Sequence, residues 1–344
     1  MEITLPRPDD FHLHLRDGAA MADVVAHSAR QFARAVVMPN LKPPVRAVAD
    51  ALAYRDRILA ALPEDADFTP LMALYLTEAT TPEDIARAAD ETAVIGVKLY
   101  PAGATTNADS GVADLARVRP VLEAMQRHDL PLLIHGEVTN PEVDVFDREA
   151  VFVDQVLDPL RRDFPALRIV LEHVTTRHAV DYVQASDGRL AATITPQHLL
   201  HNRNALFVGG LRPHYYCLPV LKLETDRQAL VEAATGNDER FFLGTDSAPH
   251  ARGTKETACG CAGIYSAHAA LELYAEAFER AGALERLADF ASRRGARFYG
   301  LSQNTGTVRL VKADWQVPDS YPFGESEVVP LRSGESLGWR FAGD

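Results

Sequence analysis

The chain has 344 residues, of which 47% are hydrophobic and 24% are charged, an ordinary composition for a globular protein with a large core. Its formal net charge of −13 makes nucleic acid and anionic membranes unfavourable partners, and no run of about 18 apolar residues indicates a membrane span. The same charge means that an anionic small-molecule substrate would need cations placed locally around it.

Eight short apolar runs rich in Val, Ile and Leu follow one another along the chain. They cover residues 10–15, 34–40, 68–77, 94–100, 130–137, 168–174, 190–196 and 240–250. Amphipathic stretches lie between several of them and predict helices, for example over residues 45–62, 81–91 and 115–129. The second stretch has a helix start signal, because Thr81 is a candidate N-cap and Pro82 suits the first helical position.

This alternation predicts an α/β fold with parallel strands joined by crossover helices. Eight such units favour a (β/α)8 barrel of the TIM type over an open doubly wound sheet. The open sheet usually has a glycine-rich turn after its first strand, where this chain has "RDGAAM". We therefore expect one domain over residues 1–344, with a barrel to about residue 300 and a short irregular C-terminal extension over residues 301–344.

The first run, "FHLHLRDG", alternates polar and apolar side chains. In a strand, residues i, i+2 and i+4 share a face. His12, His14 and Arg16 could therefore project together toward the barrel axis, although Arg16 could also lie in the loop above. Leu13 and Leu15 would then face the surrounding helices.

Side chains capable of chemistry recur at the C-terminal ends of the later runs. They are Asn40, Lys98, Tyr100, His135, His173 and Asp246, with His250 just beyond. The active site of such a barrel lies at its C-terminal face, so these residues would converge. Four histidines and an aspartate suit Zn²⁺ and similar divalent ions, and two ions about 3.5–4 Å apart can polarise a carbonyl together.

Each of these residues also has an ordinary structural explanation. A single histidine in a strand is usually a packing or surface residue, and Asp246 in "FLGTDSAPH" could cap a helix. The joint pattern favours the metal interpretation, because five separate positions would otherwise have to agree by chance.

Lys98, in "VIGVKLYP", is unexpected beside metal ligands because its ammonium would repel the ions. It could extend its amine to solvent or form an ion pair. Alternatively, burial beside cations favours the neutral amine, which reacts with CO₂ to give a carbamate that bridges two metals. Formal charge counting supports the carbamate, since it leaves the site at about +1 rather than about +3.

Several stretches resemble the amidohydrolase superfamily and, within it, the short dihydroorotases of bacteria and fungi. They lie between residue 12 and about residue 264 and include "FHLHLRDG", "AVVMPNLKPP", "VKLYPAGATTNADSGV", "PLLIHGE", "LEHVTTR" and "FLGTDSAPHARGTKE". The His-x-His element is shared across the superfamily, whereas "MPNLKPP", "GATTN" and "GTDSAPH" are more specific.

The resemblance implies a site for two Zn²⁺ ions, other divalent metals being possible. The implied ligands are His12, His14 and Asp246 for the first ion, His135 and His173 for the second, and carboxylated Lys98 as the bridge. Arg16, Asn40 and His250 resemble binders of the substrate carboxylate. The peptide groups of Leu218 and Ala262 resemble contacts to the substrate ring, and Thr105 and Thr106 resemble the tip of a loop that closes over it.

The implied reaction is the reversible hydrolysis of the cyclic amide of dihydroorotate to N-carbamoyl-aspartate, a step of pyrimidine biosynthesis. Asp246 would act as general base and then as general acid. Arg16 and the metals would form a local positive site in an acidic protein. The resemblance also suggests a homodimer.

Two other functions stay open from the sequence. One is a cyclic amidase for a different ring, such as a hydantoin or allantoin, against which Arg16 and Asn40 argue because they suit a carboxylate-bearing substrate. The other is a metal-free pseudoenzyme that serves as a binding subunit, against which the presence of all six candidate ligands argues.

The cysteines and the first residues bear on location. Cys217, Cys259 and Cys261 are an odd and sparse set, which indicates a reducing compartment rather than a disulfide framework. The opening stretch "MEITLPRPDD" is polar and acidic, unlike a secretory signal peptide. We therefore expect a cytoplasmic protein.

Overall fold

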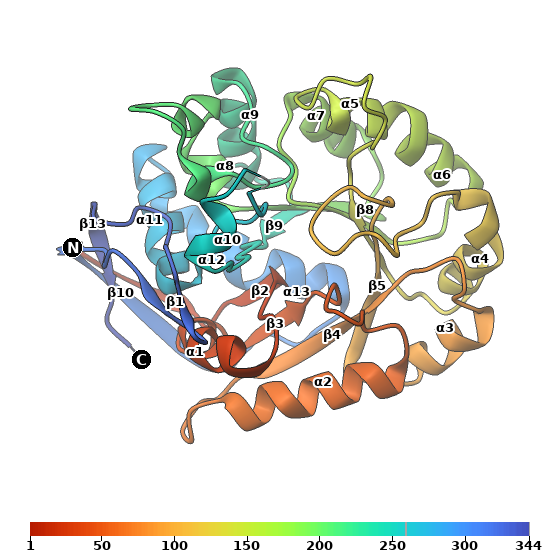
Figure 1. The fold of residues 1–344 in the computed structure, drawn as a ribbon, viewed down its shortest axis with the longest axis horizontal. Coiled ribbons are helices and arrows are strands. Elements are labelled where there is room, and N and C mark those ends of the chain that lie inside the picture. Colours follow the sequence, from red (N-terminus) through yellow and green to blue (C-terminus); the bar gives the residue numbers. More distant parts are fainter. Residues whose placement is uncertain (259, 344) are drawn as a thin grey trace.

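Eight parallel strands form the centre of the molecule (Figure 1). The computed structural model describes residues 1–258 and 260–343, so Cys259 lies outside the described residues. The strands, each paired with the next in chain order, are β2 (Asp9–Leu13), β3 (Arg34–Val37), β4 (Thr69–Tyr75), β5 (Val94–Leu99), β6 (Leu132–His135), β7 (Ile169–Glu172), β8 (Leu190–Ile194) and β9 (Phe241–Leu243). Two hydrogen bonds join the first strand to the segment after the last, from Asp246 N to His12 O (2.9 Å) and from His14 N to Ser247 O (3.1 Å). The prediction of a (β/α)8 barrel is confirmed.

Helices connect the strands and surround the barrel. They are α1 (Gly18–Ala29), α2 (Val48–Ala61), α3 (Pro82–Ala89), α4 (Arg119–Arg127), α5 (Arg148–Phe152), α6 (Asp158–Asp163), α7 (Arg177–Ala185), α8 (Pro196–Leu200), α9 (Glu224–Thr235), α10 (Arg252–Lys255), α11 (Ala270–Arg280), α12 (Leu287–Ser292) and α13 (Arg294–Tyr299). Helix α3 begins as predicted, since Thr81 Oγ1 accepts a hydrogen bond from Asp84 N and Asp84 Oδ2 accepts one from Thr81 N. Within the described residues, no helix is both long and apolar enough to cross a bilayer.

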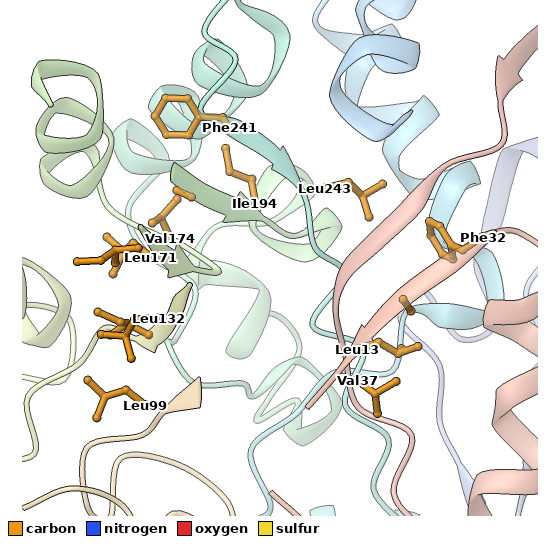
Figure 2. Packing of buried hydrophobic residues seen from close by; sticks show 14 of the residues in the cluster. Leu13, Phe32, Val37, Leu99, Leu132, Leu171, Val174, Ile194, Phe241 and Leu243 are labelled. Atoms are coloured by element: carbon orange, nitrogen blue, oxygen red, sulfur yellow. The ribbon is translucent and has the colours of Figure 1, made fainter. Parts of the chain in front are cut away.

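Side chains of the barrel strands alternate between two apolar cores. Those that face outward, such as Leu132, Leu171 and Leu243, belong to the larger core between the strands and the helices (Figure 2). Those that face inward near the N-terminal ends of the strands, such as Leu133 and Val170, fill the barrel itself. Where the strands pair regularly, the period of two therefore sends every second residue toward the barrel axis.

Aromatic rings close the floor of the barrel. Phe11 stacks on Tyr299 of α13, with ring centroids 5.0 Å apart, and meets Phe242 edge-on at 5.2 Å. The pairing of β2 with β3 is irregular between Asp10 and Leu13, which lets both Phe11 and His12 face the interior. The N-terminal end of the barrel is therefore apolar, whereas His12, which follows Phe11, lines the cavity at the C-terminal end.

The C-terminal segment after residue 300 is more regular than expected. Strand β10 (Thr307–Gln316) pairs with both β1 (Glu2–Pro6) and β13 (Ser336–Phe341) in a three-stranded antiparallel sheet, and β11 (Tyr321–Phe323) pairs with β12 (Ser326–Val328). Val308, Leu310 and Trp339 are fully buried and belong to the same core as the outer side of the barrel. The expected irregular extension is thus a small sheet, whose first strand comes from the other end of the chain.

Candidate active site

The residues predicted for the site lie around one cavity at the C-terminal ends of the strands. The predicted residues that line it are His12, His14, Arg16, Asn40, Thr105, Thr106, His135, His173, Leu218, Asp246 and Ala262. Tyr100, which also ends the fourth run, lines it as well, and so do Ala248 and Gly263, which were not predicted. Lys98 and His250 are not part of the lining, but both contact residues that are.

His12, His14 and Asp246 form a compact group. The Nε2 atoms of His12 and His14 lie 3.3 Å apart, and they lie 3.3 and 3.2 Å from Asp246 Oδ1. All three side chains are buried, and one ligand atom of each lies within 4.8 Å of the others. This donor set matches what a divalent ion such as Zn²⁺ binds.

His135, His173 and Lys98 stand beside this group. The ring of His173 lies 4.9 Å from both the His12 ring and the His135 ring, measured between centroids. Lys98 is fully buried, with its Nζ 5.1 Å from the centre of the Tyr100 ring. Among the described residues neither Lys98 Nζ nor His173 Nδ1 has a hydrogen-bond partner. Buried polar atoms without partners are rare, so these residues fit a site that holds metal ions.

Burial and charge shift the acid–base behaviour of this cluster. Burial lowers the pKa of Lys98 to about 8 and that of His14 to about 4. Burial alone would raise the pKa of Asp246, but hydrogen bonds from His12 and His14 hold that pKa well below its usual value. The site therefore favours a neutral His14, an ionised Asp246 and a Lys98 amine that is readily deprotonated. Burial opposes a charge on His12, but the neighbouring carboxylate of Glu172 and its bond to Asp246 raise the pKa of His12 above its ordinary value.

Two carboxylates orient the histidines, and sequence reasoning missed both. Glu172 Oε2 lies 2.8 Å from His12 Nδ1 and also accepts a hydrogen bond from Thr193 Oγ1 at 2.7 Å. Glu137 Oε2 lies 2.8 Å from His135 Nε2. A carboxylate on one ring nitrogen fixes the tautomer and leaves the other nitrogen as an acceptor or ligand. The sequence signal for them was their position: Glu137 lies two residues after His135, and Glu172 is the last residue of β7.

Glu149 of α5 holds the segment that follows His173. Its carboxylate accepts five hydrogen bonds, from the backbone and side-chain groups of Thr175 and Thr176. His173 itself has a positive φ of 42°, a conformation that costs energy in a residue with a side chain. The hydrogen bonds from Thr175 and Thr176 to Glu149 hold the backbone just after His173, and so stabilise its positive-φ conformation.

Arg16 lies at the rim of the cavity in a left-handed conformation, with φ 61°. Its Nε donates to Pro249 O at 2.9 Å, and its Nη2 lies 2.9 Å from His250 Nε2. His250 Nε2 also lies 2.9 Å from Ala262 O. Tyr54 supports the bend by donating its hydroxyl to Arg16 O. Arg16 therefore faces the same cavity as the histidines and brings a partly buried guanidinium beside them.

The loop that carries Thr105 and Thr106 covers the cavity. Asn40 Nδ2 donates to Thr106 O at 3.0 Å, and Asn107 Nδ2 donates to Asn40 O at 2.9 Å. Thr106 Oγ1 donates to Ala262 O at 3.4 Å. The space left in the cavity beneath this loop is small, about 20 Å³.

Lys255 of α10 holds the part of the cavity wall that contains Ala262 and Gly263. Its Nζ donates to the carbonyl oxygens of Tyr216, Cys261 and Gly263, at 3.0, 2.8 and 2.6 Å. These bonds hold the segment that contains Ala262. The lysine was not predicted, because its partners lie in a loop without a sequence pattern of its own.

An eight-stranded parallel barrel with buried histidines, an aspartate and a lysine at its C-terminal face defines a class of metal-dependent hydrolases. The model of the amidohydrolase family matches residues 10–313 of the chain. A curated dihydroorotase from Cupriavidus taiwanensis is 64% identical over 339 residues, which cover 98% of each chain.

The fold is also similar to those of solved dihydroorotase structures. A dihydroorotase from Campylobacter jejuni is 38% identical with a TM-score of 0.91, over 99% of this chain and 97% of that one. A dihydroorotase from Saccharomyces cerevisiae, in complex with 5-fluoroorotic acid, is 34% identical with a TM-score of 0.91, over 100% of this chain and 99% of that one. The chain therefore belongs to the amidohydrolase family and, within it, to the dihydroorotases.

Proposed function

We propose that the protein hydrolyses the cyclic amide of dihydroorotate reversibly, giving N-carbamoyl-aspartate. The observation that carries this proposal is the buried group of His12, His14 and Asp246, with His173, His135 and Lys98 beside it, in a chain of this family. Water adds to the ring carbonyl, the carbon–nitrogen bond breaks, and the nitrogen receives a proton. No atoms beyond one water are consumed.

The proposed cofactors are two Zn²⁺ ions, for which other divalent ions can substitute. His12, His14 and Asp246 would hold one ion, His135 and His173 the other, and Lys98, carboxylated on Nζ, both. When bound, the ions supply Lewis-acid polarisation of the carbonyl and lower the pKa of water. Two observations support the carbamate: Lys98 Nζ has no hydrogen-bond partner among the described residues, and burial lowers its pKa to about 8. The neutral amine is the form that reacts with CO₂.

Asp246 is the proposed general base and acid. Its carboxylate is ionised, because hydrogen bonds from His12 and His14 hold its pKa well below the usual value, and it lines the cavity. It can accept the proton of the attacking water and then deliver that proton to the leaving nitrogen. Glu172 and Glu137 keep the neighbouring imidazoles in fixed orientations.

Arg16, Asn40 and His250 are the proposed binders of the substrate carboxylate. The partly buried guanidinium of Arg16 can hold a carboxylate through two parallel hydrogen bonds. The structure of the yeast relative contains 5-fluoroorotic acid, a ring with a carboxylate, which supports this class of ligand. We propose further that the peptide groups of Leu218 and Ala262 contact the ring, and that Thr105 and Thr106 close over it.

The proposal extends to partners and location. The ligand is a small molecule, and the acidic charge of the protein disfavours nucleic acid and membrane. A homodimer and a cytoplasmic location are proposed, the latter because the described cysteines, Cys217 and Cys261, are free. We also propose that residues 1–344 form one domain.

Steady-state hydrolysis of dihydroorotate, with the metal content measured on the same sample, tests the function. We expect turnover that depends on about two divalent ions per chain and little turnover of an uncharged hydantoin. Equal rates on both substrates would contradict the role of Arg16. A metal-loaded, folded protein without activity on dihydroorotate would overturn the proposed function. Mass spectrometry of the native protein should show one CO₂ adduct on Lys98.

A further inference from the structure

A second cavity lies away from the barrel mouth, lined by residues at α1, α11 and the C-terminal strands. Its volume is about 230 Å³, close to the lower end of the range for small-molecule sites, which begins at about 300 Å³. The residues that line it come from six separate elements between His27 and Phe341. None of them belongs to the candidate active site.

Buried polar atoms without partners face this cavity. His268 is 1% exposed, and neither of its ring nitrogens has a hydrogen-bond partner among the described residues. Glu272 is also 1% exposed, and while its Oε1 accepts a hydrogen bond from Phe341 N at 3.2 Å, its Oε2 is unpartnered in the same part of the chain. An unsatisfied buried polar atom costs about 1–3 kcal/mol, so a ligand that supplies partners would relieve this cost.

Aromatic side chains form the walls. The Tyr321 ring lies 4.7 Å from the His27 ring and 5.7 Å from the His268 ring, and Trp315 and Phe341 line the same space. His27 is held by a hydrogen bond between its Nδ1 and the hydroxyl of Tyr265. Flat apolar walls with a few polar groups favour a planar ring over a flexible chain.

The open side of the cavity carries positive charge. Arg30 lies 3.7 Å from Glu272 and rests over the Phe341 ring at 5.5 Å. Arg340 is exposed, and within the described residues its guanidinium has no hydrogen bond or ion pair. Two guanidiniums and one buried carboxylate leave a positive excess in a protein of net charge −13.

A metal ion is not the expected ligand here. The metal-type cluster found in the described residues is His12, His14 and Asp246, so the ligand atoms of His27, His268 and Glu272 are not gathered closely enough. Instead, we propose that this cavity binds a small planar anion, namely one aromatic or heteroaromatic ring that carries a carboxylate. The ring packs against the aromatic walls, a ring N–H of His268 donates to a heteroatom on its edge, and Arg340 with Arg30 receives the carboxylate.

The two tryptophans of the chain provide a direct test, because Trp315 lines the cavity whereas Trp339 is fully buried in the core. Nicotinate is titrated into the metal-loaded protein while tryptophan emission is recorded, and nicotinamide serves as the uncharged match of the same shape. We expect a saturable change with nicotinate in the millimolar range and binding of nicotinamide weaker by about tenfold, the loss of one charge-assisted bond.

Three variants complete the test. Trp315→Phe should remove the emission change, and Arg340→Gln should weaken nicotinate binding by about tenfold. Arg309→Gln is the matched control, since this exposed arginine on β10 pairs with Glu2 outside the cavity and should leave the titration unchanged. A linear response, equal responses to the two compounds, or unchanged binding in Arg340→Gln would each overturn the proposal. Hydrolytic activity is not the readout, so these results are independent of the proposed function.

Discussion

At its N-terminal end the barrel is filled by aromatic and aliphatic side chains, whereas its C-terminal end is filled by histidines, carboxylates and a lysine. The same strands supply both: β6 contributes Leu133 below and His135 above, and β7 contributes Val170 below and Glu172 above. Burial of apolar area stabilises the fold, while burial of charged groups opposes it. The comparison indicates that the floor supplies stability and the mouth supplies chemistry.

The largest expected effect is at the mouth. Asp246→Asn should lower kcat for dihydroorotate by about 10⁴-fold, because an amide can neither accept the proton nor replace the carboxylate as a ligand. The fold should survive, but the free energy of unfolding should fall, because the lowered pKa of Asp246 means that the folded state stabilises its charge through His12 and His14. Steady-state kinetics and urea denaturation measure the two quantities. Asp238→Asn, in a partly exposed ion pair with Arg240, is the control and should retain activity. If Asp246→Asn turned over substrate at a near-normal rate, Asp246 would not be the general base.

The opposite result is expected at the floor. Phe242→Ala should lower the free energy of unfolding by about 3–5 kcal/mol, since Phe242 is fully buried against Phe11. The activity of the molecules that remain folded should change little. Phe298→Ala, at the half-buried edge of the same cluster, should cost less. Equal losses of activity in Asp246→Asn and Phe242→Ala would remove the distinction between floor and mouth.

A smaller effect is expected at Glu172, which contacts the candidate ligand His12 rather than the cavity. Glu172→Gln keeps the shape of the side chain but weakens its bond to His12 Nδ1, so metal affinity should fall by about 10–100-fold. Competition with a chelator measures this affinity without reference to turnover. Excess metal should restore most of the activity. If metal affinity were unchanged, Glu172 would have only a packing role.

The smallest effect is expected at Lys255, which holds the active-site segment around Ala262 without lining the cavity itself. Lys255→Met should raise KM by about tenfold with a smaller change in kcat, because three carbonyls lose their donor and the segment around Ala262 shifts. Arg252→Met, on the same helix but at the surface, serves as the matched control. A fall in kcat with KM unchanged would show that Lys255 does not act through substrate binding.

The sequence predicted well what depends on strand period and strand order. His12, His14, His135 and Asp246 could be placed together because each ends a strand or follows one, and strand ends converge in a barrel. The barrel and the family are confirmed by the structure and the relatives. The ligand roles of these residues stay predictions.

What the sequence could not predict depends on partners far away along the chain. Glu149 is an ordinary helical glutamate until the fold brings it to Thr175 and Thr176. Glu172 shares a face with Val170 and points inward, and a buried carboxylate requires a partner, but nothing local identifies that partner as His12. The strand β10 was missed for the same reason, since its neighbour β1 lies at the start of the chain.

The pairing of β1 with β10 also bears on how the chain is made. Glu2 lies opposite Val311, so during synthesis the first strand emerges long before its partner exists. Until then its backbone groups form an open edge, and β13 adds its strand to the other side of β10 later still. The barrel strands that follow can pair with their neighbours in the order of their appearance. A newly made molecule therefore completes its catalytic barrel first and fastens its two ends last.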